Sequence, residues 1–154
     1  MNRLAASLIL FLSCCQVLAD DSITGLTVEN ARIREAPPTA AVLAGYMTLI
    51  NTSGKSIRVT GVSSPDFAAA ELHRTVVEDG VARMTPVEQL EVPAHERRVL
   101  EPGGLHLMLI NPHQPLSDGD SVTLDLEDSA GGCMRISAPV QRMTGAGAAH
   151  HHHH

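Results

Sequence analysis

Aromatic and basic residues are scarce in this 154-residue chain. It contains two Phe, one Tyr and no Trp, and its 11 Lys and Arg are outnumbered by 17 Asp and Glu, which gives a net charge of −6. A nucleic-acid-binding surface needs clustered basic side chains and, for single strands, aromatic rings on which bases stack. The composition therefore argues against nucleic acid as a partner.

The start of the chain has the three parts of an export signal. Met1–Arg3 is positively charged, Leu4–Leu12 is an apolar run too short to span a bilayer, and Val17–Ala19 is a small-residue cleavage site before Asp20. We predict a secretory signal peptide over residues 1–19 and a mature protein in the periplasm.

Cysteine is also scarce. Cleavage after Ala19 would remove Cys14 and Cys15 and leave Cys133 alone, so the mature chain could form no internal disulfide. We expect Cys133 to pack in the core or at a sheet edge, with oxidation or metal-promoted dimerisation as the alternative. A second alternative concerns the leader: Leu12–Cys15 loosely resembles a lipobox, and acylation of Cys14 or Cys15 would anchor the protein to lipid.

Short β-strand patterns fill the rest of the chain. Apolar and polar residues alternate, turn residues recur roughly every 8–12 positions, and amphipathic helix patterns are almost absent. Residues 67–77 are rich in Ala, but Thr75–Val77 and the Asp79-Gly80 turn favour a strand that enters a hairpin. The pattern predicts an all-β fold, an antiparallel Greek-key β-sandwich, over residues 20–142.

Three local expectations follow from turn and alternation signals. A first strand over residues 24–35 should contain a bulge at Asn30-Ala31, where the alternation changes phase. Residues 57–62 should form the hairpin partner of the strand over residues 40–50. Glu101–Gly104 should form a type II turn that leads into the next strand.

Residues 105–109 direct different side chains to the two faces of one strand. Three leucines should point into the core, while His106 and Met108 share the opposite face. An imidazole and a thioether suit Cu(I) better than Zn²⁺, Ca²⁺ or Mg²⁺.

Further ligands for such an ion should lie on neighbouring strands. His73 and Met84 lie on either side of Asp79-Gly80, and hairpin pairing would bring them close together. Ten residues separate His73 from Met84, twenty-one separate Met84 from His106, and one separates His106 from Met108. We predict that these four side chains form one Cu(I) site.

This spacing resembles the signature of the periplasmic copper chaperones called PCu(A)C: His, ten residues, Met, twenty-one residues, then His-x-Met. All four positions match, and the resemblance covers residues 24–140. It extends to the segments Glu78–Gly80, Met84–Val87, Pro102–Gly104, His106–Leu109 and Leu116–Asp120. One departure is Arg74, because many members have a Met directly after the first His.

The resemblance implies a cupredoxin-like fold and a Cu(I) carrier rather than an enzyme. It also implies delivery of copper to the CuA centre of cytochrome c oxidase, directly or with a Sco-type thiol metallochaperone. Copper buffering for tolerance is the alternative function within this class.

Three other classes of function compete with a carrier. A blue-copper protein needs a Cys with two His, and no His follows Cys133 before the tail. A zinc hydrolase using His73 with Glu71, Glu78 or Asp79 would need an open water position, and the H-E-x-x-H spacing is absent. A structural sandwich without metal would need none of these residues.

The remaining histidines have simpler interpretations. We expect His95 and His113 to be solvated. Residues 143–154 form a His-rich tail, in which His150, His151, His152, His153 and His154 are either a purification tag or a native tract able to bind Cu(II).

Overall fold

The computed structural model describes residues 22–143, which fold into ten β-strands. Nothing in this part of the chain forms a helix long and apolar enough to cross a bilayer. The predicted signal peptide, Cys14, Cys15 and the five tail histidines lie outside the described residues. The strands are β1 (Leu26–Arg34), β2 (Val42–Asn51), β3 (Ile57–Ser63), β4 (Phe67–Glu78), β5 (Val81–Pro86), β6 (Leu90–Val92), β7 (Arg97–Leu100), β8 (Leu105–Pro112), β9 (Ser121–Asp128) and β10 (Cys133–Gln141).

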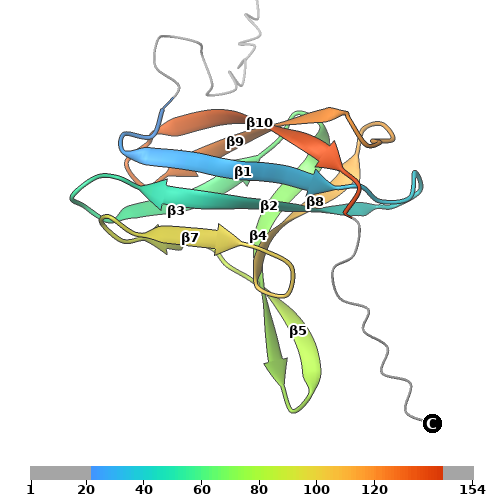
Figure 1. Cartoon of the computed structure of the whole chain (residues 1–154), viewed down its shortest axis with the longest axis horizontal. Coiled ribbons are helices and arrows are strands. Elements are labelled where there is room, and N and C mark those ends of the chain that lie inside the picture. Colours follow the sequence, from blue (N-terminus) through green and yellow to red (C-terminus); the bar gives the residue numbers. More distant parts are fainter. Residues whose placement is uncertain (1–21, 144–154) are drawn as a thin grey trace, which may run out of the picture.

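The strands form one continuous hydrogen-bonded order, β5-β4-β8-β7-β2-β1-β10-β9-β3-β6, with a further pairing of β8 to β2. Figure 1 shows that this order curls into a sandwich. The strands β10, β9 and β3 lie in the layer opposite β1 and β2. Most neighbours are antiparallel, as predicted. The exceptions are β1 with β10 and β7 with β8, which run parallel.

The core lies between the two halves of this order. Alternation along β2 and β8 buries Leu49, Leu107 and Leu109, while β9 contributes Val122 and Leu124, each with at most 2 % of its surface exposed. Burial of side chains of this size contributes about 1.5–3 kcal/mol each. The predicted inward face of the 105–110 strand is therefore confirmed for these leucines.

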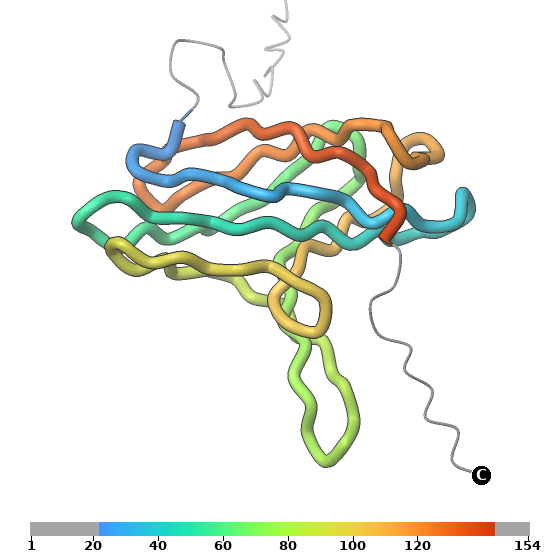
Figure 2. Tube along the Cα trace, viewed as in Figure 1, coloured from blue at the N-terminus to red at the C-terminus, as the bar shows by residue number. Residues whose placement is uncertain are grey.

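A hairpin arm projects from the body of the sandwich. The last ladder pair of β4 with β8 is Arg74 with Leu105, and beyond it β4 pairs only with β5. Figures 1 and 2 show this hairpin, residues 75–86, extending away from the other strands. Asp79 and Gly80 have φ values of 51° and 75°, which match a type I′ turn, and the predicted hairpin is confirmed.

The local expectations have mixed outcomes. The bulge is confirmed, because the β1 register shifts between Glu29 and Arg32 and Asn30 has a φ of 54°. The turn before β8 is confirmed by the amide of Gly104, which donates to the carbonyl of Glu101.

The expected hairpin of residues 57–62 with the preceding strand is wrong, because β3 pairs with β6 and β9 instead. The short turn after β2 redirects the chain into the other half of the sandwich, where Ile57 and Val59 are buried. Local turn residues predict a reversal but not the strand that receives it.

Candidate metal-binding face

The two predicted histidine ligands are cross-strand neighbours. In the antiparallel pairing of β4 with β8, His73 lies directly opposite His106. Directly opposed residues in such a pair direct their side chains to the same face of the sheet, with Cβ atoms about 4.5–5.5 Å apart. Two imidazoles far apart in the sequence therefore lie side by side.

The two predicted methionine ligands share that face. Met108 follows His106 by two residues in β8, so its side chain emerges on the same side. On β5, Pro86 lies opposite His73 and Met84 lies opposite Thr75, which makes Met84 a diagonal neighbour of His73. Diagonal neighbours about 7–8 Å apart are within reach of long side chains. We call this surface of β5, β4 and β8 the candidate face.

The imidazole rings lie close to the spacing that one shared ion requires. Their centroids are 6.2 Å apart with 40° between the planes. A metal bound about 2 Å from a ring nitrogen lies roughly 3 Å from the ring centroid, so two rings on one ion have centroids up to about 6 Å apart. The observed separation slightly exceeds that limit, so side-chain rotations must bring the rings closer together before one ion can bind both.

Each imidazole has one hydrogen-bonded ring nitrogen. The His106 Nδ1–H donates to the carbonyl oxygen of Gly104 at 3.0 Å. The His73 Nε2 atom is 2.8 Å from the Glu71 carboxylate. In each ring one nitrogen is thereby left without an oxygen partner, and for a neutral ring it carries a lone pair.

Burial differs across the candidate face. The His106 residue is 7 % exposed and the His73 side chain 13 %, while Met84 is 60 % exposed. Among the described residues, His73 Nδ1 is a buried side-chain nitrogen with no hydrogen-bond partner. Such an atom costs about 1–3 kcal/mol, a cost that a bound cation would remove. The donor set and this nitrogen fit a soft monovalent ion.

Arg74, the departure from the family signature, does not alter the candidate face. It follows His73 directly in β4, so its side chain leaves the strand on the opposite side. Glu71 is the neighbour that the motif did not indicate as part of a copper site. It lies two residues before His73 and opposite Met108, hence on the same face.

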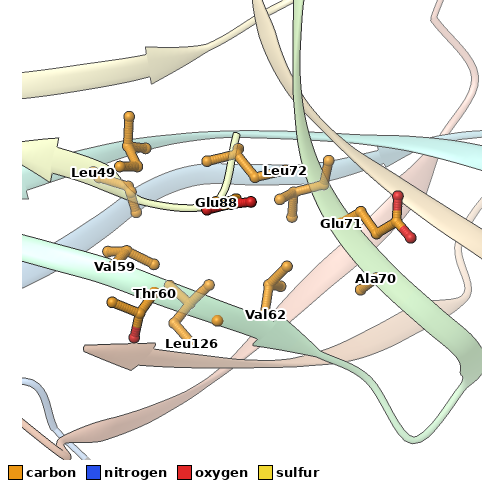
Figure 3. A pocket seen from close by; sticks show the side chains of 12 residues that line it. Leu49, Val59, Thr60, Val62, Ala70, Glu71, Leu72, Glu88 and Leu126 are labelled. Carbon is orange, nitrogen blue, oxygen red and sulfur yellow. The ribbon is translucent and has the colours of Figure 1, made fainter. Parts of the chain in front are cut away.

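An apolar cavity of about 210 Å³ lies on the other side of β4. Figure 3 shows Leu72 directed toward Leu49 in this cavity, while the Glu71 carboxylate points away from it. None of the four predicted ligands lines the cavity. The cavity wall is mainly aliphatic, so it offers few donors for a metal ion.

The other candidate ligands lie apart from this face. His95 and His113 are exposed as predicted, and the His113 Nδ1–H donates to the Pro65 carbonyl. Cys133 begins β10 and is half-buried. Within residues 22–143, no three His, Cys, Asp or Glu side chains are grouped to hold a metal ion.

Comparisons with known proteins agree on the family to which this chain is similar. The family model described as "Putative lipoprotein LpqE-like" matches residues 26–140. The relative "Putative lipoprotein Lxx21020" of Leifsonia xyli subsp. xyli is 28% identical over 123 residues, which are 79% of this chain and 73% of the relative.

Two solved structures show the same fold. The solution structure of CuI-DR1885 from Deinococcus radiodurans is 28% identical with a TM-score of 0.64, over 79% of this chain and 81% of that one. The copper-bound PCuAC domain from PmoF2 is 20% identical with a TM-score of 0.67, over 79% and 97%. The resemblance indicated by the four-residue signature is thereby confirmed. The chain belongs to the LpqE-like family, and its fold is that of the PCuAC domains.

Proposed function

We propose that this protein binds Cu(I) on the candidate face and carries it to a copper enzyme outside the cytoplasm. The proposed ligands are His73, Met84, His106 and Met108. The proposed recipient is the CuA centre of cytochrome c oxidase, reached directly or through a Sco-type thiol partner. In this role the protein is a carrier and catalyses no reaction.

The observation that carries the proposal is the strand register. It places two imidazoles directly opposite each other and two thioethers on the same face, from positions 73 to 108 of the chain. Thioether sulfur and imidazole nitrogen are ligands suited to Cu(I), whereas hard cations prefer carboxylate and carbonyl oxygens.

The ligand chemistry also suits release. Neutral thioethers and imidazoles are weaker ligands for Cu(I) than thiolates, so a partner presenting cysteines can take the ion by stepwise exchange. Met84 is the most exposed of the four ligands. We infer that exchange begins at Met84, while His106 and Met108 still hold the ion.

The relatives support both the ion and the compartment. The Deinococcus protein was solved with copper(I), at 28% identity to this chain. The family and the Leifsonia relative are named as lipoproteins. Together with the predicted export signal, these names support a location outside the cytoplasm, in the periplasm, either free or anchored through Cys14 or Cys15.

Anaerobic competition for Cu(I) against a chromogenic chelator tests the binding step. All proteins in this assay end before His150, so that tail imidazoles do not contribute. We expect wild type to withdraw one Cu(I) per chain, and His106→Ala and Met108→Ala to withdraw far less at the same chelator concentration. Equal retention in wild type and both variants would reject the site.

A matched control uses a histidine away from the candidate face. His113→Ala removes an exposed imidazole directly after the end of β8, and this variant should retain copper like wild type. The transfer step is tested by adding a dithiol protein to the loaded chain. Copper that stays with this chain in the presence of excess acceptor would favour a storage role instead.

A further inference from the structure

The two histidines of the candidate face form their hydrogen bonds through different ring nitrogens. His106 uses Nδ1, which must carry the proton because the Gly104 carbonyl can only accept. His73 uses Nε2, whose 2.8 Å partner is the Glu71 carboxylate. An ionised carboxylate also only accepts, so the His73 proton resides on Nε2.

The lone pairs of the two rings are therefore on different atoms. In His106 the lone pair is on Nε2, and in His73 it is on Nδ1. The His73 Nδ1 atom is buried and has no hydrogen-bond partner. Neither fact follows from the spacing of ligands in the sequence, since both nitrogens of either ring could reach a metal in principle.

We propose that Glu71 is a positioning residue that holds His73 as its Nε2–H tautomer, so that His73 binds Cu(I) through Nδ1 while His106 binds it through Nε2. This inference rests on the proposed function and adds the ligating atoms and the residue that selects them. A carboxylate that accepts from the free N–H of a metal-bound imidazole fixes both its tautomer and its orientation.

The placement of Glu71 favours this role over direct ligation. Glu71 and His73 are two residues apart in β4, so both side chains lie on the candidate face. Glu71 is half-exposed, with 50 % of its side chain accessible, and it contacts the ring nitrogen opposite to the buried one. Its negative charge also lies near the monovalent ion, whose four ligands are all neutral.

The first test reads the ring nitrogens directly. Cu(I) is a closed-shell ion, so long-range ¹H–¹⁵N correlation spectra of the ¹⁵N-labelled full chain can be recorded before and after anaerobic loading. We expect the Nε2–H pattern for His73 and the Nδ1–H pattern for His106 before loading. On loading, the copper-dependent shifts should fall on His73 Nδ1 and His106 Nε2. A larger copper-dependent shift at His73 Nε2 than at His73 Nδ1 would overturn the inference.

The second test uses variants of Glu71 with a matched control. Glu71→Ala should lose the uniform Nε2–H pattern of His73 and weaken Cu(I) binding about 10- to 100-fold. Glu71→Gln keeps a carbonyl oxygen that can accept from Nε2–H, and it should recover most of that loss. Glu78→Ala removes an exposed glutamate from the same strand, on its other face, and should change neither readout.

The outcomes separate this inference from the proposed function. If wild type does not bind Cu(I), the proposed function fails. If wild type binds Cu(I) but Glu71→Ala binds it equally well with an unchanged His73 pattern, the function stands and only the role of Glu71 is rejected.

Discussion

The body of the sandwich and the arm are made of the same antiparallel ladder, yet their side chains have different surroundings. In the body, β8 buries Leu107 and Leu109 almost completely. In the arm, all six residues of β5 are exposed, and Val77 is 70 % accessible. The body can therefore hold its conformation by packing, whereas the arm depends on its turn and its ladder hydrogen bonds. The candidate face spans the two regions, with His106 and Met108 on the body and Met84 on the arm.

The largest expected effect concerns packing in the body. Leu109→Ala should lower the free energy of unfolding by about 2–5 kcal/mol, because the residue is fully buried behind the candidate face. Val77→Ala in the arm should change it by less than about 0.5 kcal/mol. Urea unfolding of both variants measures the difference. Similar losses would mean that the arm also packs against something in solution.

A smaller effect should appear at Met84, the proposed ligand on the arm. Met84→Leu keeps the apolar volume but removes the sulfur, so Cu(I) affinity should fall at least tenfold, which is about 1.4 kcal/mol. The unfolding free energy without copper should stay within about 0.5 kcal/mol of wild type, because Met84 is exposed. Chelator competition and urea unfolding are measured on the same sample. Unchanged affinity would confine the site to the body.

The turn of the arm should show a local effect of similar or smaller size. Gly80 has a φ of 75°, a left-handed conformation that costs a residue with a Cβ about 1–2 kcal/mol. Gly80→Ala should therefore speed hydrogen exchange at arm amides such as that of Arg83, while amides in β8 keep wild-type protection. Equal acceleration in both regions would show that arm and body unfold together.

The smallest expected effect concerns an ion pair in the body and an ion pair in the arm. In the body, Arg142 and the Asp118 amide both donate to Glu35, and these bonds lower the pKa of its carboxyl. A lowered folded pKa adds stability at neutral pH, and this contribution is lost as pH falls through the ordinary carboxyl range to the folded value. Glu35→Gln should make the acid loss of stability shallower.

Glu78→Gln is the comparison in the arm. Glu78 and Arg83 are 4.0 Å apart and both are two-thirds exposed, so this pair adds little stability, and the variant should change the free energy of unfolding by less than about 0.5 kcal/mol. Unfolding curves at a series of pH values measure both variants. A larger change in the free energy of unfolding for Glu78→Gln than for Glu35→Gln would contradict this ranking of the two ion pairs.

Features set by neighbouring residues were predictable from the sequence. The Asp79-Gly80 turn, the bulge near Asn30 and the alternation of leucines with His106 and Met108 each depend on a few adjacent positions. Spacing and family resemblance also predicted the four proposed ligands, and the strand register puts these residues on one face.

Features set by distant residues were not predictable in this way. The pairing of β3 with β6 and β9, and the parallel contact of β1 with β10, depend on which strand surfaces bury the most apolar area together. The hydrogen bond from His73 to Glu71 depends on side-chain rotamers, which spacing does not specify. The extension of the arm beyond the body follows from the shorter reach of β8.

The two-residue turn of the arm has a consequence for how its length can vary. With Glu78 paired to Val81, each β4 residue from His73 to Glu78 meets a fixed partner on β5, and Met84 falls on the side that holds His73. Adding one amino acid at the tip would turn the Met84 side chain to the opposite face of the hairpin without harming the fold. Adding a second would return it to the candidate face. Insertions of odd and even length at the tip should therefore alternate between copper-poor and copper-competent chains.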